Sequence, residues 1–317
     1  MVLSGSNASK SRLLIPFLHF FANLYSSRIM YKILTKRTLA QGVVLMEVEA
    51  PRVARSALPG QFMMVRAYEK GERIPLTICD YDPFRGTVTV VTQIVGLSTH
   101  LINAKEEGGY FLDFSGPLGM ASEFVHSTSE EIKSKRYLFL AGGLGAAPVY
   151  PQAKYLFEKG AQVDVVIAAK TKDMLILTKE MKTVCNHLFL ATDDGSEGYH
   201  GLITGFLKEH LSAGAGYDQA VAIGPMVMMK FVTITLQEFD LPLIVSLNTI
   251  MVDGTGMCGA CRVSVGGKTK FACVDGPEFN GYEVDFDEAM RRQLMYKEME
   301  TAANHACKIG REGGHEV

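Results

Sequence analysis

Three of the six cysteines, Cys258, Cys261 and Cys273, lie within sixteen residues, and this cluster constrains the chain more than any other feature. A chain of 317 residues can bury a full hydrophobic core, so disulfides are not needed to hold it together. We therefore expect a reducing compartment, the cytoplasm, and thiols that bind a metal or take part in redox chemistry.

The spacing around this cluster predicts a [2Fe–2S] site. Asp253 is followed after four residues by Cys258 and after two more by Cys261, the C-x4-C-x2-C spacing of plant-type [2Fe–2S] proteins with an acid in the first place. A carboxylate oxygen also binds ferric iron, so the aspartate and three thiolates give four ligands. Residues 262–271 are typical of a hairpin that returns Cys273 to the cluster. The predicted metal ligands are Asp253, Cys258, Cys261 and Cys273.

Glycines in the same loop favour this interpretation. Gly254, Gly256 and Gly259 allow positive φ angles and bring backbone N–H groups close to cluster sulfurs. Two other interpretations stay open: a structural zinc ion held by the same three cysteines and the aspartate, and three unrelated core thiols. The C-x2-C spacing fits zinc as well as iron, whereas the x4 spacing and the glycines favour iron–sulfur.

Residues 30–125 predict an antiparallel β-barrel. Their apolar residues fall in short runs, with turn residues such as Pro59-Gly60 between them. The expected strands are Val43–Glu49, Gln61–Ala67, Ile74–Asp80, Thr87–Val95 and Tyr110–Phe114.

Residues 132–247 predict a doubly wound α/β domain. Strands that are apolar on both faces alternate with helical patterns, as in buried parallel sheets. The expected strands are Tyr137–Ala141, Val163–Ala168, Leu188–Thr192, Ala220–Ile223 and Leu243–Leu247, and the expected helices are Ala147–Glu158, Gly201–His210 and Met226–Glu238.

Three further segments complete the expected organisation. Residues 248–284 form a small [2Fe–2S] domain, and 285–317 form a C-terminal helix, expected over Glu288–Lys308, with a polar tail. Residues 1–29 are an N-terminal extension, disordered or loosely helical, whose apolar run is too short to span a bilayer. We expect no membrane span, and a formal charge of −2 leaves no basic surface for nucleic acid.

A glycine-rich turn between a buried strand and a helix predicts nucleotide binding. Gly142, Gly143 and Gly145 allow the backbone to approach a pyrophosphate, and the dipole of the following helix favours its charge. Two later strands end in Asp193-Asp194-Gly195 and Gly224-Pro225-Met226, at the carboxyl ends where such sheets bind ligands. Either of these could instead be an ordinary turn.

Two weaker signals lie in the barrel region. Arg73 and Thr77 share one face of an expected strand, where an arginine could hold a diphosphate and a hydroxyl could reach a flavin ring. Alone, such residues are commonly solvated. In Gly96-Leu-Ser-Thr99, Ser98 could cap a short helix whose free N–H groups face an anion, or be an ordinary N-cap.

In their order and spacing, these motifs resemble the iron–sulfur branch of the ferredoxin–NADP reductase superfamily, from Met30 to about Cys307. Two relatives in that branch compete. One is the electron-transfer subunit of dihydroorotate dehydrogenase. The other is the small alpha subunit of NADH-dependent reduced ferredoxin:NADP oxidoreductase, also called the sulfide dehydrogenase beta subunit. The first places four cysteines around its cluster, so Asp253 favours the second.

The resemblance implies FAD, a [2Fe–2S] cluster, and NAD(H) or NADP(H) as cofactors. Plant-type reductases carry a cysteine just before the Gly-Pro of the nicotinamide pocket, and this chain has Ile223, so their hydride-transfer details are not carried over. By resemblance, FAD contacts Arg73, Pro75, Leu76, Thr77, Gly96, Ser98 and Thr99, and the nicotinamide nucleotide contacts Gly142, Gly143, Gly145, Asp193, Asp194, Gly195, Gly224, Pro225 and Met226.

The implied function is electron transfer in an NAD(P)H-dependent oxidoreductase. Hydride would pass between nicotinamide and FAD, and single electrons would pass through the cluster to a larger flavin and iron–sulfur subunit, with ferredoxin reached through the complex. No protein acid, base or nucleophile is required, so no catalytic side chain is expected beyond cofactor contacts. The alternatives are the dihydroorotate dehydrogenase subunit and a non-catalytic regulatory subunit on a reductase scaffold.

Overall fold

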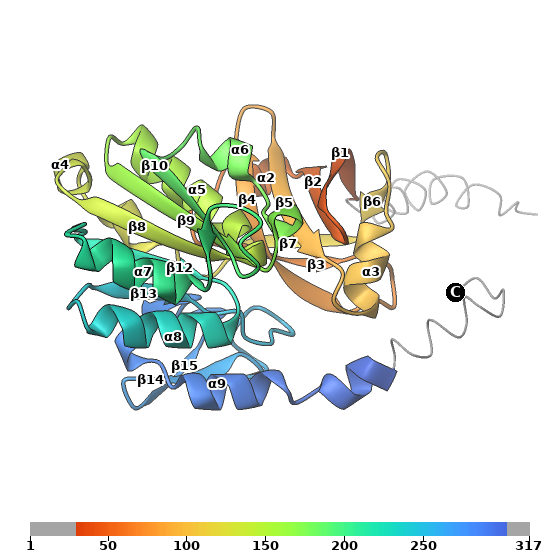
Figure 1. The fold of residues 1–317 in the computed structure, drawn as a ribbon. Coiled ribbons are helices and arrows are strands. Elements are labelled where there is room, and N and C mark those ends of the chain that lie inside the picture. The colour runs from red at the N-terminus through yellow and green to blue at the C-terminus, as the bar shows by residue number, and fades with distance from the viewer. Residues whose placement is uncertain (1–29, 303–317) are drawn as a thin grey trace, which may run out of the picture. The chain divides into compact units, whose positions relative to one another are not determined.

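Two seven-stranded sheets and a two-stranded hairpin organise the chain (Figure 1). The structure is a computed structural model and describes residues 30–302. The predicted N-terminal extension, residues 1–29, and the polar tail lie outside the described residues. Within residues 30–302, no helix has the length and apolar character needed to cross a bilayer.

The first sheet is antiparallel and has the order β6-β1-β2-β5-β4-β3-β7. Its edge strands β6 and β7 are separated in sequence by Leu112 alone, so the sheet curls into a nearly closed barrel. Alternate side chains such as Ile33, Met46 and Phe114 fill the interior. The strands are β1 (Tyr31–Ala40), β2 (Val43–Glu49), β3 (Phe62–Arg66), β4 (Arg73–Asp82), β5 (Thr87–Gln93), β6 (Tyr110–Phe111) and β7 (Asp113–Leu118), with helices α2 (Pro51–Ala54) and α3 (Leu97–Asn103).

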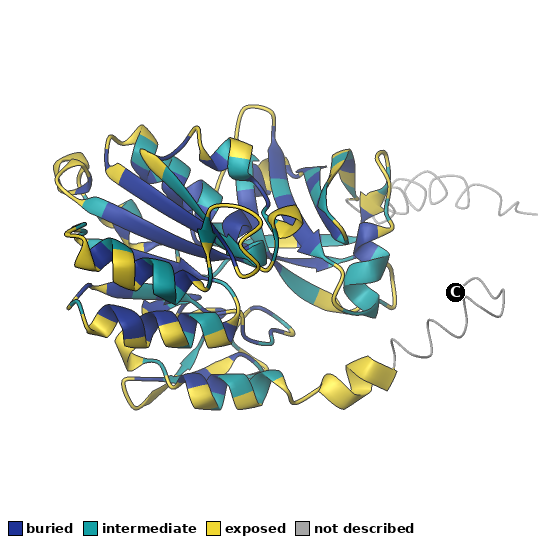
Figure 2. Cartoon of the chain, in the orientation of Figure 1, coloured by how far each residue is buried: buried dark blue, intermediate teal, exposed yellow. Residues whose placement is uncertain are grey.

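The second sheet has the order β11-β10-β9-β8-β12-β13-β16 and is parallel except for β16. Its central strands are buried along nearly all of their length, which is why they are apolar on both faces (Figure 2). The strands are β8 (Arg136–Gly142), β9 (Gln162–Ala169), β10 (His187–Thr192), β11 (Tyr199–His200), β12 (Gln219–Ile223), β13 (Leu243–Ser246) and β16 (Glu278–Asn280).

Helices cover both faces of this sheet. Leu138 and Leu140 of β8 face the core shared with α7 and α8, whereas Phe139 faces the core shared with α5. The helices of this region are α4 (Ser129–Lys133), α5 (Ala146–Glu158), α6 (Thr178–Met181), α7 (Ile203–Ser212) and α8 (Met226–Gln237). The antiparallel barrel and the doubly wound sheet confirm the predicted fold class.

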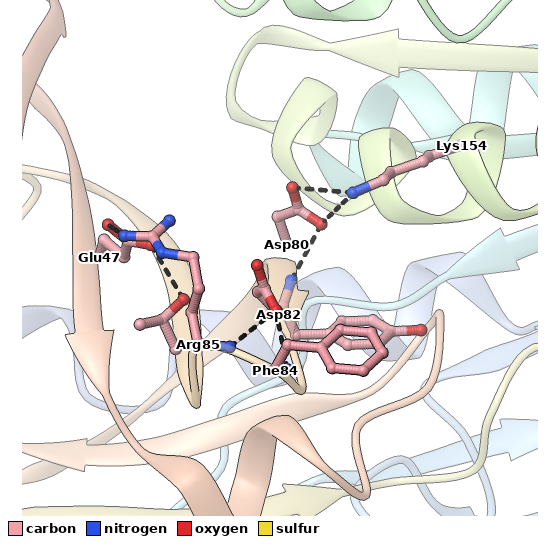
Figure 3. A network of polar contacts seen from close by, with 8 residues as sticks. Glu47, Asp80, Asp82, Phe84, Arg85 and Lys154 are labelled. Carbon is pink, nitrogen blue, oxygen red and sulfur yellow. Dashed lines mark hydrogen bonds and ion pairs between the residues drawn. The ribbon is translucent and has the colours of Figure 1, made fainter.

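Helix α5 also packs on the outside of the barrel. Its Lys154 forms an ion pair with Asp80 of β4, with 2.9 Å between Nζ and Oδ1 (Figure 3). Beneath this pair, Cys79 is buried in the core that α5 shares with the sheet. In the same view, Arg85 pairs with Glu47 on the outer surface of the barrel.

The segment that contains the cysteine cluster is inserted between two neighbouring strands. β13 ends at Ser246, and β16 pairs with it in antiparallel register, with Ser246 opposite Glu278. Between them, β14 (Arg262–Val265) and β15 (Lys268–Phe271) form the predicted hairpin, with Arg262 opposite Phe271.

The predicted C-terminal helix, Glu288–Lys308, is interrupted within the described residues, and residues 303–308 of it lie outside them. α9 (Phe286–Gln293) begins after an N-cap at Asp285, whose carboxylate accepts a hydrogen bond from Glu288 N. The helix breaks at residues 294–296, and a second helical stretch starts at 297. Met290 packs on the core shared with α8, but Leu294 is exposed, so the apolar pattern beyond α9 has no core to bury it.

Candidate functional site

The loop from Asp253 to Cys258 folds around its own aspartate. Asp253 Oδ1 accepts a hydrogen bond from Thr255 N, and Oδ2 accepts one from Cys258 N, both at 2.8 Å. These bonds lower the pKa of the Asp253 carboxyl, so it is a carboxylate at neutral pH. Gly256 lies in the loop with φ +83°, a conformation that favours glycine.

Two of the predicted ligands are in contact. The hairpin returns Cys273 to Cys261, with 3.3 Å between their Sγ atoms, and both residues are buried. Burial raises the pKa of the Cys273 thiol, and the neighbouring thiol raises it further. The Gly256 N–H donates to this sulfur and acts in the opposite direction, lowering the pKa.

The structure does not assemble the full predicted ligand set. Cys258 is exposed, and within the described part of the chain no three His, Cys, Asp or Glu side chains are arranged to hold a metal ion. The donor chemistry nevertheless fits an iron–sulfur group, because three thiols, one carboxylate and an N–H directed at sulfur lie in one short segment. The same three thiols and carboxylate would also satisfy zinc, so the geometry leaves that alternative open.

The glycine-rich turn lies at the switch point of the parallel sheet. From β8 the chain proceeds through β9 and β10 in one direction and then places β12 and β13 on the other side. Such sheets bind ligands outside the carboxyl ends of the two central strands. Here those ends carry Gly142–Gly145, which starts with the last residue of β8, and Gly224–Met226, which leads from β12 into α8.

These two turns pack so closely that side chains are excluded between them. A Cβ on Gly145 would lie 2.0 Å from the carbonyl oxygen of Ile223, and one on Gly224 would lie 3.0 Å from Gly142 Cα. The side chain of Met228, from α8, lies beneath both turns. The start of α5 adjoins these turns and has no side-chain cap, so the first N–H groups of the helix suit a pyrophosphate.

The third predicted nucleotide segment lies further away. Asp193, Asp194 and Gly195 follow β10, and β9 separates that strand from β8. Asp194 is exposed, and hydrogen bonds from the Ser196 hydroxyl and backbone N–H lower its pKa. These residues therefore share the sheet edge with the glycine turns but not the switch point itself.

Two arginines share one carboxylate at the start of β4. Arg73 lies opposite Arg66 of β3, and both pair with Asp113 of β7, at 3.0 Å and 2.7 Å. The group carries a net positive charge, and Arg73 is about half exposed, with its side chain at 47%. Arg66 was not among the residues predicted from the sequence, although the register opposite Arg73 would have identified it.

The other residues predicted to contact FAD fall into two groups. Pro75 and Thr77 follow Arg73 on the outward face of β4, whereas the Leu76 side chain belongs to the barrel core and leaves only its backbone available. Ser98 is close to the start of β4, because its hydroxyl donates to Glu72 at 2.6 Å. Gly96 has open space around it.

The prediction that Ser98 caps helix α3 is wrong. The N-cap is Gly96, and Ser98 lies inside the first turn. The Thr99 hydroxyl oxygen accepts hydrogen bonds from the backbone N–H groups of Val95 and Gly96, so it supplies the capping interaction instead. A threonine at the third helical position can bond back to the cap residue, and that leaves Ser98 free to bind Glu72.

We expect Arg73→Ala to weaken FAD binding by about ten- to a hundredfold, because a hydrogen bond to a charged group contributes about 1.5–3 kcal/mol. Asp113 keeps its ion pair with Arg66, so the fold should survive. Fluorescence titration of the flavin-free variant measures the affinity. Arg85→Ala removes another exposed barrel arginine and is the control (Figure 3). Equal FAD affinity in both variants would contradict the phosphate contact.

Comparisons with known proteins match the cluster segment by itself and most of the chain as a whole. The model of the iron-sulfur cluster binding domain of dihydroorotate dehydrogenase B matches residues 248–285. A dihydroorotate dehydrogenase B (NAD(+)) electron transfer subunit homolog from Thermotoga maritima is 46% identical over 269 residues, 85% of this chain and 92% of that protein. An electron transfer subunit of this enzyme from Desulforamulus reducens is 30% identical over 260 residues, 80% of this chain and 96% of that protein.

One solved structure is similar over nearly its whole length. A chain from the NADH-dependent reduced ferredoxin-NADP oxidoreductase, described in connection with flavin-based electron bifurcation, is 43% identical, with a TM-score of 0.81. The match covers 89% of this chain and 99% of that chain.

Proposed function

This chain belongs to the family of dihydroorotate dehydrogenase B electron transfer subunits and their homologues, and from that premise we propose that it passes electrons between a nicotinamide nucleotide and a larger partner subunit. It is thus an electron-transfer subunit of the oxidoreductase class. The family and the fold support the predicted cofactor set of FAD, an iron–sulfur cluster and a nicotinamide nucleotide.

One observation carries the proposal: the nucleotide turns and the cluster segment belong to the same sheet. The order β8-β12-β13-β16 places the glycine turns after its first two strands and attaches the cluster segment to its last two. When bound, FAD converts between the two-electron chemistry of nicotinamide and the one-electron chemistry of a cluster. The protein then has to hold these groups at a fixed separation, which a shared sheet does.

The residues act by binding and orienting. Gly142, Gly145 and Gly224 present backbone to the pyrophosphate, and Arg73 supplies a cation for the FAD phosphates. Asp253, Cys258, Cys261 and Cys273 would hold the cluster, with the Gly256 N–H stabilising negative charge on sulfur. Asp193, Asp194 and Gly195 remain proposed contacts at the edge of the nucleotide site.

Asp253 in the first ligand position favours the ferredoxin:NADP oxidoreductase type of complex over dihydroorotate oxidation, because the dihydroorotate branch places four cysteines around its cluster. Identity alone does not separate the two types, since the solved ferredoxin-NADP oxidoreductase chain is 43% identical and the Thermotoga maritima homolog of the dihydroorotate dehydrogenase subunit is 46% identical. We therefore propose a large flavin and iron–sulfur subunit as the partner, with ferredoxin reached through the complex. The cytoplasm remains the proposed location.

Anaerobic purification from the native source tests the proposal. We expect bound FAD, iron and acid-labile sulfide, flavin absorbance that bleaches on addition of NADH or NADPH, and a large redox subunit that co-elutes. Mass spectrometry of that subunit separates the two types of complex. A colourless protein that does not bind FAD would indicate the regulatory scaffold instead, and bound zinc without sulfide would contradict the cluster.

A further inference from the structure

One carboxyl group lies where three parts of the chain meet. Glu278 begins β16, directly after the cluster segment, and its Oε1 accepts hydrogen bonds from Ser122 Oγ at 2.9 Å and Gln152 Nε2 at 2.8 Å. Ser122 follows the barrel and Gln152 lies on α5, and both side chains are fully buried. Gly60, just before β3, is so close that a Cβ there would lie 2.9 Å from Oε1.

Backbone hydrogen bonds dock the same segment on both sides. Met120 N donates to the Gly276 carbonyl oxygen at 2.6 Å, which ties the segment to the end of the barrel. Leu247 N donates to the Pro277 carbonyl oxygen at 2.9 Å, which ties it to the parallel sheet. Glu278 is therefore the side chain that joins the cluster segment to the barrel and α5.

The surroundings suit a carboxyl group that carries a proton. Gln152 Oε1, the other end of the amide that donates to Glu278, is buried without a hydrogen-bond partner among the described atoms. An ionised carboxylate can only accept, so it cannot satisfy this oxygen. A protonated Glu278 has one donor, and rotation of the carboxyl or amide about its last bond would let it donate there.

The electrostatics point the same way. Burial raises the pKa of Glu278 from 4.5 to about 7, more than the hydrogen bonds from Ser122 and Gln152 lower it. Of the groups that face it from the adjoining elements, the Glu123 carboxylate is charged, and it raises the pKa further. In the described part of the chain no cation pairs with this carboxyl group.

We propose that Glu278 is a positioning residue that, while protonated, fastens the cluster segment to the barrel and α5. Loss of the proton leaves a negative charge that faces the Gln152 oxygen and the Glu123 carboxylate. The resulting repulsion weakens the attachment of the cluster segment to the barrel and α5. The assignment does not depend on which nucleotide or partner the protein uses.

The direction of the pH effect follows from linkage. The folded chain binds this proton more tightly than the unfolded chain, so the stability that protonation contributes is present below the unfolded value of 4.5 and is lost as pH rises through about 7. Between about pH 5 and pH 8, the factor by which the unfolding equilibrium constant increases should be roughly a hundred times larger in the wild type than in Glu278→Gln.

Two measurements on the full-length protein, purified anaerobically, test the proposal. Infrared spectra should contain a protonated-carboxyl band that is absent from Glu278→Gln and titrates near pH 7. Thermal unfolding should lose stability with rising pH in the wild type and in Glu283→Gln, an exposed control in the short helical turn after β16, but much less in Glu278→Gln. A structural role alone would shift stability equally at every pH.

A third variant keeps the test valid if Glu278→Gln does not fold. Glu123→Gln leaves Glu278 in place and removes the neighbouring charge, so the infrared band should titrate at lower pH than in the wild type. Three results would overturn the assignment. The first is a wild-type band that disappears near the ordinary pKa of glutamate, and the second is a band in Glu123→Gln that titrates at the same pH as in the wild type. The third is the same dependence of stability on pH in the wild type and in Glu278→Gln.

Discussion

Replacement of Cys273 by serine is expected to remove nearly all iron and acid-labile sulfide from the purified protein. Its sulfur lies 3.3 Å from that of Cys261, another proposed ligand, and accepts the Gly256 N–H. A serine oxygen is a poor substitute for a thiolate ligand of iron, and its hydroxyl would be buried at a site that is 2% exposed. Iron and sulfide analysis with electron paramagnetic resonance measures the loss.

Cys185→Ser is the matched control for that experiment. Cys185 is also a buried thiol, and burial raises its pKa to about 11, but it belongs to the core around α5 and is far in sequence from the loop. This variant should retain iron and sulfide at the wild-type level. If Cys273→Ser also retained its full content of both, the proposed coordination would be wrong.

Gly145→Ala is expected to abolish measurable nicotinamide binding and to lower the free energy of unfolding by about 3 kcal/mol, the cost of severe overpacking. The added Cβ would lie 2.0 Å from a backbone carbonyl oxygen, that of Ile223, which cannot move aside as a flexible side chain could. The turns after β8 and β12 would have to separate, and the backbone surface for the pyrophosphate would be lost. Denaturant unfolding and nucleotide titration measure the two effects.

Gly216→Ala is a control with the same chemical change. Gly216 lies in an exposed loop where an added Cβ meets nothing within 4 Å, so both stability and nucleotide binding should stay near the wild type. Unaltered nucleotide affinity in Gly145→Ala would place the nucleotide elsewhere on the sheet edge.

The sequence predicted the elements whose apolar pattern is set by a core. β2 has the predicted bounds, because its buried residues largely alternate along the strand. β8 and β12 differ from their predicted bounds by one residue or two, because they are buried on both faces and read as continuous apolar runs. β1 was missed, since Ile33 is its one buried residue and two register irregularities interrupt its pairing. β16 was missed because it has only three residues, too few to show the alternation of apolar and polar side chains that predicts a strand.

The sequence predicted which residues lie close together where local chemistry was enough, whereas their roles as ligands stay predictions. Cysteine spacing and the glycines after β8 depend on neighbours in sequence, and the structure brings Cys261 to Cys273 and Gly142 to Gly224. Contacts made by distant segments could not be foreseen. Arg66 meets Asp113 only through sheet register, and Glu278 meets Gln152 across 126 residues of chain.

The pairing of Ser246 with Glu278 has a further consequence. The two ends of the metal-binding segment therefore lie side by side near the edge of the sheet, so the segment is an insertion between two paired strands. Excision of residues 248–277 would leave two antiparallel strands that a tight turn could join. Two chain connections, one at each end, therefore hold this segment to the sheet, so it cannot rotate about a single linker.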